Sequence, residues 1–276
     1  MKNRKLMIIA VAIFVLILIT LIIGKINLSV QFNKEVAELF SQTKNSSTKS
    51  FKREQILGLP EPVQRYFKHV LREDQPFIRY VKFTHDGQFK PGLDKEWINI
   101  IGEQYVSTET PGFIWKGTTT MFTARDMYIA EKGRLIVSFF SIFPIVDGNG
   151  EQYNKSELIR WLGESVLYPT NLLPGERLQW SAIDTQSAKL TFAYNGLSLF
   201  FTVIFNDAGE IIQLETTRYM DKNKSAPWII KLGNYKEKNG VFVPTSTEVL
   251  WRLEKGDFSY ARFNIVNIEY NMPARY

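Results

Sequence analysis

The sequence predicts an α+β protein that is mostly antiparallel β. We expect an N-terminal transmembrane helix followed by a curved meander sheet, an incomplete β-barrel, which two or three helices cover. Three observations lead to this fold class: an uncharged apolar run near the N-terminus, about a dozen short segments of alternating polarity, and two amphipathic helical segments that need a sheet to pack against.

The apolar run at residues 6–23 predicts a membrane span. Its eighteen residues contain no charge and only one polar residue, Thr20, which is about the length needed to cross a bilayer. A cleaved signal peptide is the alternative, but its apolar region is shorter and ends at a small-residue cleavage site. Lys2, Arg4 and Lys5 precede the run, so the N-terminus should be cytoplasmic and the body extracytoplasmic, in a single-pass protein of the cell membrane.

The net charge of +6 is concentrated at this end of the chain. Residues 1–25 contain four basic and no acidic residues, which leaves 6 − 4 = +2 for the other 251 residues. We therefore expect no nucleic-acid partner. The absence of cysteine excludes disulfides and cysteine-ligated metals, and two histidines offer little for metal binding. We predict neither a metal nor a cofactor, and we assign no catalytic residue.

Three regions follow from this pattern. Residues 1–25 are the expected cytoplasmic tail and transmembrane anchor, and 57–276 the β-rich extracytoplasmic domain. Between them, 26–56 is a juxtamembrane segment with a short helix at 33–40 and a polar linker at 41–50, which has no apolar residue.

The body contains two predicted helices. The first opens at Pro60, where the missing N–H of proline is tolerated, and its apolar residues share one face. The second covers 154–167, and Asn154 to Glu157 resembles a capping box. Both have wide apolar faces, which argues against a simple sandwich and favours a sheet that curls over the helices.

The strands are predicted by residues that alternate in polarity. This alternation is clear in 77–90, 187–195 and 241–253, and turn signals such as Asn239-Gly240 separate the runs. Short turns favour an antiparallel meander, because parallel strands need long crossovers. A curved sheet over a helix leaves an apolar concavity, the usual setting for a hydrophobic ligand.

Three segments resemble the landmarks of an uncharacterised bacterial family of membrane-anchored proteins of unknown function. They are LPEPVQRYF at 59–67, PGFIW at 111–115 and YPTNLLP at 168–174, and the resemblance spans roughly 57–270. At the level of the fold, the arrangement also resembles the periplasmic lipoprotein carriers, in which an incomplete barrel wraps helices around a lipid-binding cavity. The resemblance implies a cavity for lipid or another apolar ligand. An anchor would prevent shuttling and leave handover or retention of lipid at the membrane.

Two other functions are left open by the residues. A hydrolase could use His85 as the base of a triad or a pair of carboxylates. The acidic residues available for such a pair, on or near strands, are Asp86, Glu103, Asp126 and Glu131. The sequence brings no two of them together. A structural or interaction domain of the cell envelope is the third possibility, and no protein partner is specified.

The residues expected to line a ligand site come from these patterns. Strand parity places Arg79 and His85 on an apolar face, where a charge must reach the rim, pair with an internal acid or meet a ligand anion. Aromatic side chains supply walls, and the 168–174 loop supplies a lip. The candidates are Arg79, His85, Phe113, Trp115, Trp161, Tyr168, Leu172, Leu173 and Trp180.

Overall fold

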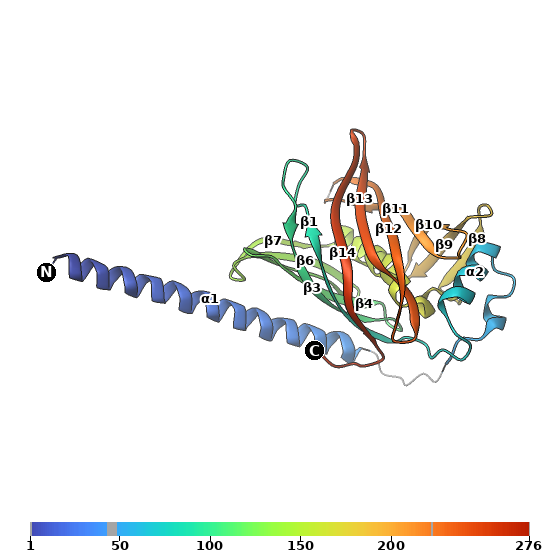
Figure 1. The fold of residues 1–276 in the computed structure, drawn as a ribbon, viewed down its shortest axis with the longest axis horizontal. Coiled ribbons are helices and arrows are strands. Elements are labelled where there is room, and N and C mark those ends of the chain that lie inside the picture. Colours follow the sequence, from blue (N-terminus) through green and yellow to red (C-terminus); the bar gives the residue numbers. More distant parts are fainter. Residues whose placement is uncertain (1, 43–48, 222, 276) are drawn as a thin grey trace.

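The computed structural model of the chain describes residues 2–42, 49–221 and 223–275. It confirms the predicted fold class: a long N-terminal helix leads to a large, curved and unclosed antiparallel sheet with a few helices (Figure 1). The helices are α1 Lys2–Ser41, η1 Arg53–Ile56, α2 Glu61–Val70, α3 Glu151–Gly163, η2 Glu164–Leu167 and η3 Pro169–Leu172, where η marks a short 3₁₀ helix.

Fourteen strands form one sheet in the described residues, and each pairing is antiparallel. In chain order they are β1 Tyr80–Phe89, β2 Ile98–Asn99, β3 Ile101–Ser107, β4 Gly112–Thr118, β5 Phe122–Ile129, β6 Lys132–Phe139, β7 Phe143–Asn149, β8 Leu178–Ala182, β9 Ser187–Tyr194, β10 Leu197–Phe205, β11 Ile211–Tyr219, β12 Ser225–Lys238, β13 Val241–Leu253 and β14 Gly256–Tyr270.

The order across the sheet is β7-β6-β5-β4-β3-β1-β14-β13-β12-β11-β10-β9-β8, with β2 beside β1. Most neighbours are consecutive, as in a meander, but β1 and β14 bring the first and last strands together and join the two halves. At the β12–β13 turn, Asn239 and Gly240 have φ values of 49° and 81°, the left-handed conformation that an Asn-Gly hairpin requires.

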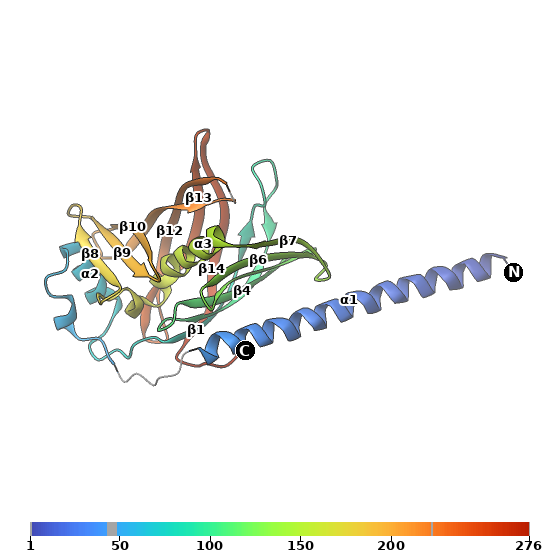
Figure 2. The same cartoon turned by 180° about the vertical axis from the view of Figure 1, so that it is seen from behind.

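The helices of the body differ in how well the sequence places them. α2 begins at Glu61, directly after Pro60, as predicted. α3 begins at Glu151, so the capping box at Asn154 is wrong. The Asn154 side chain instead accepts a hydrogen bond of 2.8 Å from the Gly133 N–H, which ties the helix to β6. Figure 2 shows α3 on the concave side of the sheet.

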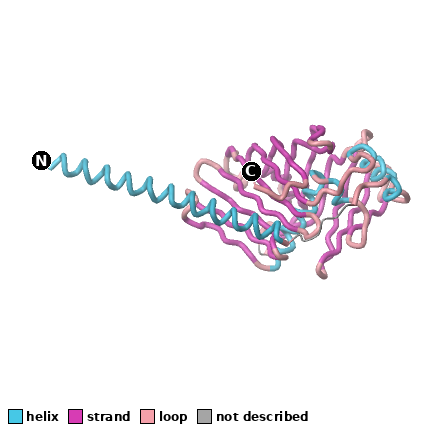
Figure 3. Tube along the Cα trace, turned by 90° about the horizontal axis from the view of Figure 1, so that it is seen from below, coloured by secondary structure: helices cyan, strands magenta, loops and turns pink. Residues whose placement is uncertain are grey.

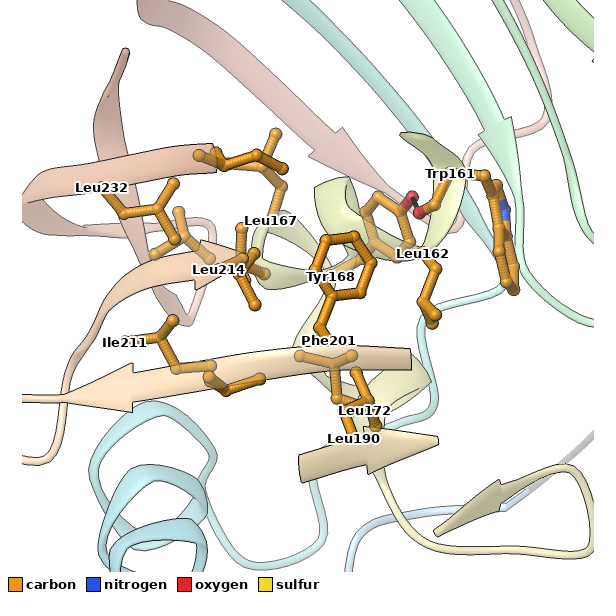
Figure 4. Packing of buried hydrophobic residues seen from close by; sticks show 14 of the residues in the cluster. Trp161, Leu162, Leu167, Tyr168, Leu172, Leu190, Phe201, Ile211, Leu214 and Leu232 are labelled. Atoms are coloured by element: carbon orange, nitrogen blue, oxygen red, sulfur yellow. Dashed lines mark hydrogen bonds between the residues drawn. The ribbon is translucent and has the colours of Figure 1, made fainter. Parts of the chain in front are cut away.

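The main core fills the space between this helical segment and the strands of the C-terminal half. Figure 4 shows Trp161, Leu162, Tyr168 and Leu172 packed against residues such as Phe201 on β10. The polar groups of Trp161 and Tyr168 are hydrogen-bonded within this core. Trp161 Nε1 donates to the Ser107 carbonyl at 2.9 Å, and the Tyr168 hydroxyl donates to the Trp161 carbonyl at 2.8 Å. The core is therefore closed on this side of the helices.

α1 joins the apolar run to the body as one continuous helix. No residue of its most apolar stretch is buried, and within the described residues α1 alone is long and apolar enough to cross a membrane. The predicted boundary at residue 25 falls inside α1, and the helix predicted at 33–40 is its final part. Of the predicted linker, 43–48 lies outside the described residues.

The last turns of α1 dock on the convex face of the sheet. Phe32, Val36 and Leu39 are buried against apolar side chains of β3, β4, β5 and β6, and Figure 3 shows the long helix passing across strands of the sheet. Glu35 forms an ion pair with Arg125 of β5 beside this contact. The helix therefore has a fixed direction relative to the sheet.

Candidate ligand-binding cavity

A cavity of about 640 Å³ lies between α3 and η2 and the concave face of the sheet. Its walls come from both halves of the sheet, and aromatic and aliphatic side chains dominate them. Among these lining residues are Phe83, Ile100, Trp115, Trp228, Ile230, Trp251, Tyr260 and Phe263. The volume falls in the range of small-molecule sites, which are typically concave, mostly apolar and contain a few polar groups.

Two glycines make room for His85 and Trp115 in the cavity wall. His85 is paired with Gly102, which is paired with Gly117 on the next strand. A Cβ at Gly102 would lie 2.1 Å from the His85 ring, and one at Gly117 would lie 2.2 Å from the Trp115 ring. Both rings therefore lie flat over backbone that only glycine leaves open.

His85 is a neutral hydrogen-bonding member of this wall. Its Nε2 accepts a hydrogen bond from Trp115 Nε1 at 2.7 Å, so the proton is on Nδ1, 3.3 Å from the carbonyl oxygen of Asp86. Burial lowers the pKa of His85 to about 4. Within the described residues neither ring nitrogen hydrogen-bonds to a hydroxyl or a carboxylate, so the geometry does not support the triad hypothesis.

A buried polar network runs along the α3 side of the cavity, and Arg160 is at its centre. Its guanidinium donates to Asp126 of β5 at 2.5 Å, to Glu164 at 2.8 Å and to the side-chain carbonyl of Gln104 of β3 at 3.1 Å. The side-chain amide nitrogen of Gln104 donates a hydrogen bond to the Glu164 carboxylate at 2.5 Å. Arg160 and each of these partners line the cavity. The network therefore places charged and hydrogen-bonding groups at the cavity wall.

The network continues to the other half of the sheet through Glu157. Arg218 of β11 donates to a Glu157 carboxyl oxygen and to the Ser156 carbonyl, both at 3.0 Å. The other oxygen of Glu157 and Oδ1 of Asp126 are buried without a hydrogen-bond partner in the described part of the chain. Burial, followed by the nearby Asp126 carboxylate, raises the pKa of Glu157 to about 8. A protonated Glu157 can donate to Asp126, which satisfies both groups.

Neutralising Glu157 should change how folding stability depends on pH. The pKa of the Glu157 carboxyl rises from 4.5 to about 8 on folding, so the folded state binds this proton more tightly than the unfolded state. The contribution of Glu157 to the free energy of unfolding therefore falls as pH rises between these two values, by up to about 1.4 kcal/mol per pH unit. We expect Glu157→Gln to match the wild type near pH 5 and to melt higher above pH 8, because its amide keeps both hydrogen bonds.

Thermal unfolding across pH 5–9 measures this difference. His85 contributes in the opposite direction, since its lowered pKa reduces stability as pH falls, and comparison at each pH cancels its effect. Glu254→Gln, on the exposed β13–β14 turn, is the control and should follow the wild type. Parallel curves for Glu157→Gln and wild type would show that Glu157 ionises normally in the folded chain.

Comparison with known proteins identifies the family. Residues 49–263 match the model of a family of unknown function, DUF6544. The chain belongs to the DUF6544 family. This confirms the resemblance to a family of unknown function that the sequence predicts. No curated protein matches the chain.

Several solved structures are similar to this DUF6544 protein in fold. A domain from Vibrio parahaemolyticus assigned to outer membrane lipoprotein sorting has a TM-score of 0.42 and 12% identity, over 81% of this chain and 95% of its own. A LolA superfamily protein from Nitrosomonas europaea has a TM-score of 0.41 and 10% identity, over 76% and 92%. A DUF1329 protein from Desulfovibrio piger has a TM-score of 0.34 and 9% identity, over 72% and 88%.

Two of the nine predicted lining residues of the DUF6544 domain, His85 and Trp115, line the cavity. Arg79 does not. It precedes β1 and forms a paired hydrogen bond with Glu109, at 2.8 and 3.1 Å, so an internal acid satisfies its charge. Phe113 is buried beneath the Arg160 guanidinium, 4.9 Å from its ring centroid.

The other five predicted residues belong to the closed core instead. The expected lip at 168–174 folds into η3, which follows η2 directly, and this continuation buries side chains that an open loop would expose. Trp180 donates to the Leu172 carbonyl at 2.9 Å, which seals this end. The residues placed in this way are Trp161, Tyr168, Leu172, Leu173 and Trp180.

The polar network is the part of the DUF6544 site that sequence reasoning missed. Glu157, Arg160 and Glu164 recur at intervals of three and four residues and so share one face of α3 and of its continuation into η2. That spacing indicates a charged face, and the natural expectation is that it contacts water. The strands curl over this face, so its charges are buried and pair with Asp126 and Arg218 from distant strands.

Proposed function

We propose that this chain is a membrane-anchored, extracytoplasmic domain that binds a hydrophobic or lipid-like ligand in the cavity between α3 and the sheet. The observation that carries the proposal is the cavity itself: about 640 Å³ of space with mostly apolar walls. Protein interiors are otherwise packed with few voids larger than a water molecule. A space of this size and lining suits an acyl chain or another apolar group.

The walls suggest an amphipathic ligand rather than a pure hydrocarbon. Apolar contacts would come from both halves of the sheet, while Arg160, Gln104 and Glu164 provide donors and acceptors along α3. A polar head group could hydrogen-bond there while its apolar part fills the space next to Trp228 and Trp251. Because the network contains charges of both signs, its strength lies in hydrogen bonds and not in net charge.

The anchor in this proposal is α1. None of its uncharged segment at 6–23 is buried, and such an apolar surface is costly in water and favourable in a bilayer. The basic residues before it, with none acidic among residues 1–25, place the N-terminus in the cytoplasm by the positive-inside rule. The cavity would then be presented outside the cell membrane and would hold its ligand there.

Brominated lipid should quench the tryptophans of the cavity. Trp115, Trp228 and Trp251 are three of the six tryptophans and line the cavity, while Trp161 and Trp180 are in the closed core. We expect dibromostearate, added to the full chain in detergent, to quench a saturable part of the emission. Replacing both Trp228 and Trp251 by phenylalanine should remove most of that part.

A variant that fills the cavity separates binding from contact with micelles. Ala261 of β14 is buried and lines the cavity, so Ala261→Phe should weaken the quenching by about tenfold or more, the equivalent of about 1.4 kcal/mol. Ala193→Phe on the exposed side of β9 is the matched control and should bind like the wild type. Quenching that never saturates, or that Ala261→Phe leaves unchanged, would count against the cavity as a ligand site.

A further inference from the structure

An exposed apolar surface lies at one end of the N-terminal half of the sheet. It consists of residues 119–122, at the β4–β5 turn, and residues 139–146, which comprise the β6–β7 turn and the strand ends beside it, and we call it the apolar rim. Phe143 is 60% exposed, Ile145 57% and Met121 48%. The Phe140 N–H donates to the Met121 carbonyl at 2.7 Å, so the two turns lie side by side.

The sequence of the apolar rim contains no charge. The segments 117–124 and 135–146 lack Asp, Glu, Lys and Arg altogether, although turns on a protein surface are usually polar. Exposed apolar side chains that stand singly are ordinary, but a contiguous group marks an interaction site. This group therefore requires an apolar partner.

The position of α1 identifies that partner. A Cβ at Gly24 would lie 2.3 Å from Ile142 Cγ1, so the β6–β7 turn touches α1 directly after the apolar run at 6–23. Figure 1 shows the ends of β6 and β7 on the side of the sheet from which α1 extends to the N-terminus. The contact of Phe32, Val36 and Leu39 with the sheet holds this geometry. The apolar rim is thus held at the level where the span would leave the hydrocarbon.

The apolar rim is also part of the mouth of the cavity. Ile145 and Val146 line the cavity and are exposed, and Thr119 and Phe122 from the neighbouring turn line it and are half-buried. Lining residues deeper in the site, such as Phe83 and Ile230, are buried. A ligand can therefore pass from this edge into the cavity along apolar side chains.

We propose that the apolar rim inserts into the surface of the lipid bilayer beside the span and that lipid enters the cavity at this edge. The inference rests on the proposed function, since it requires α1 to be a membrane anchor and the cavity to take lipid. Burial of the rim removes its apolar area from water, in the manner of other interfacial segments. A ligand then moves from bilayer to cavity without crossing water, which suits a protein that does not shuttle.

Site-specific fluorescence tests the insertion. The chain has no cysteine, so Phe143→Cys can be labelled with the environment-sensitive dye NBD in the full chain reconstituted in phosphatidylcholine vesicles. We expect blue-shifted emission that spin-labelled phosphatidylcholine quenches at least about twofold. Ile183→Cys is the control, because Ile183 is 51% exposed but follows β8 at the opposite edge of the sheet. Its label should stay in water and resist quenching.

Three results would overturn the inference. A label at position 143 that reports water in vesicle-bound protein would do so and leave the proposed function intact, because tryptophan quenching tests the cavity separately. Blue-shifted emission that spin-labelled lipid leaves unquenched would show that a second copy covers the rim. Failure of the full chain to float with vesicles would contradict both the proposed membrane anchor and this inference.

A charge on the apolar rim tests the route into the cavity. Phe143 does not line the cavity, so Phe143→Asp should leave the binding of dibromostearate in detergent unchanged. We expect the same variant to take up brominated phosphatidylcholine from its own vesicles about tenfold more slowly than the wild type, while Ile183→Asp keeps the normal rate. Equal uptake rates in the two variants would contradict the route.

Discussion

Replacing Arg160 with methionine is expected to destabilise the domain by about 3–5 kcal/mol. Methionine fills a similar space but leaves the buried Asp126 and the partly buried Glu164 next to the cavity without the cation that pairs with them. The carboxylates of Glu164 and Asp126 raise the pKa of Arg160 against the opposing effect of burial, so the guanidinium is charged throughout the accessible pH range. Its removal exposes the full cost of two anions in a poorly hydrated site.

Chemical unfolding of the full chain in detergent measures this loss. The control is Arg134→Met, because Arg134 forms a similar ion pair with Asp147 at 2.7 Å, but both side chains are nearly half exposed and such pairs contribute about 0–1 kcal/mol. A triple variant that adds Asp126→Asn and Glu164→Gln should recover most of the lost stability. If Arg160→Met costs no more than Arg134→Met, the network is hydrated rather than buried.

Arg160 also connects the network to the aromatic wall. Its guanidinium carbon lies 5.1 Å from the Trp115 ring centroid, and Trp115 donates to His85. A cation at this distance from an indole face is held by the ring quadrupole. The charged and apolar parts of the wall are therefore in direct contact at Arg160 and Trp115.

The sheet and the helices of the body were predictable because their signals are local. Alternation marks β9 and β13, and Asn239-Gly240 marks the hairpin between β12 and β13. The docking of α1 was not predictable in the same way. Phe32, Val36 and Leu39 show helical spacing, but the surface that buries them is assembled from four strands whose alignment no single segment encodes.

The residues of the candidate site were likewise predictable only in part. His85 was found because strand parity places it on the apolar face of its strand, and Trp115 because it is an aromatic residue on a strand; both line the cavity. Arg160 and Glu157 were missed because a charged helix face normally contacts water, and only the curvature of the sheet buries it. The segment 168–174, predicted as a lip, is instead part of the core because the chain continues there as 3₁₀ helices. The leucines of this segment alone do not indicate these helices.

Gly87→Ala is expected to destabilise the fold by about 3 kcal/mol or more. Gly87 is within the β1–β14 pairing, opposite Phe263, and has a φ of 146°. An added Cβ would lie 2.0 Å from the carbonyl oxygen of Arg262 and 2.9 Å from the Cα of Phe263. Both are backbone atoms, so no side-chain rotation relieves the contact and the strands must separate.

The position of this contact makes its effect global. β1 and β14 are the seam between the two halves of the sheet, and the cavity takes its walls from both halves. We therefore expect Gly87→Ala to lower the melting temperature and to abolish saturable quenching by dibromostearate together. Gly175→Ala is the matched control, because an added Cβ there meets nothing within 4 Å, and it should leave both unchanged. Loss of stability with normal ligand binding would mean that the cavity does not depend on the seam.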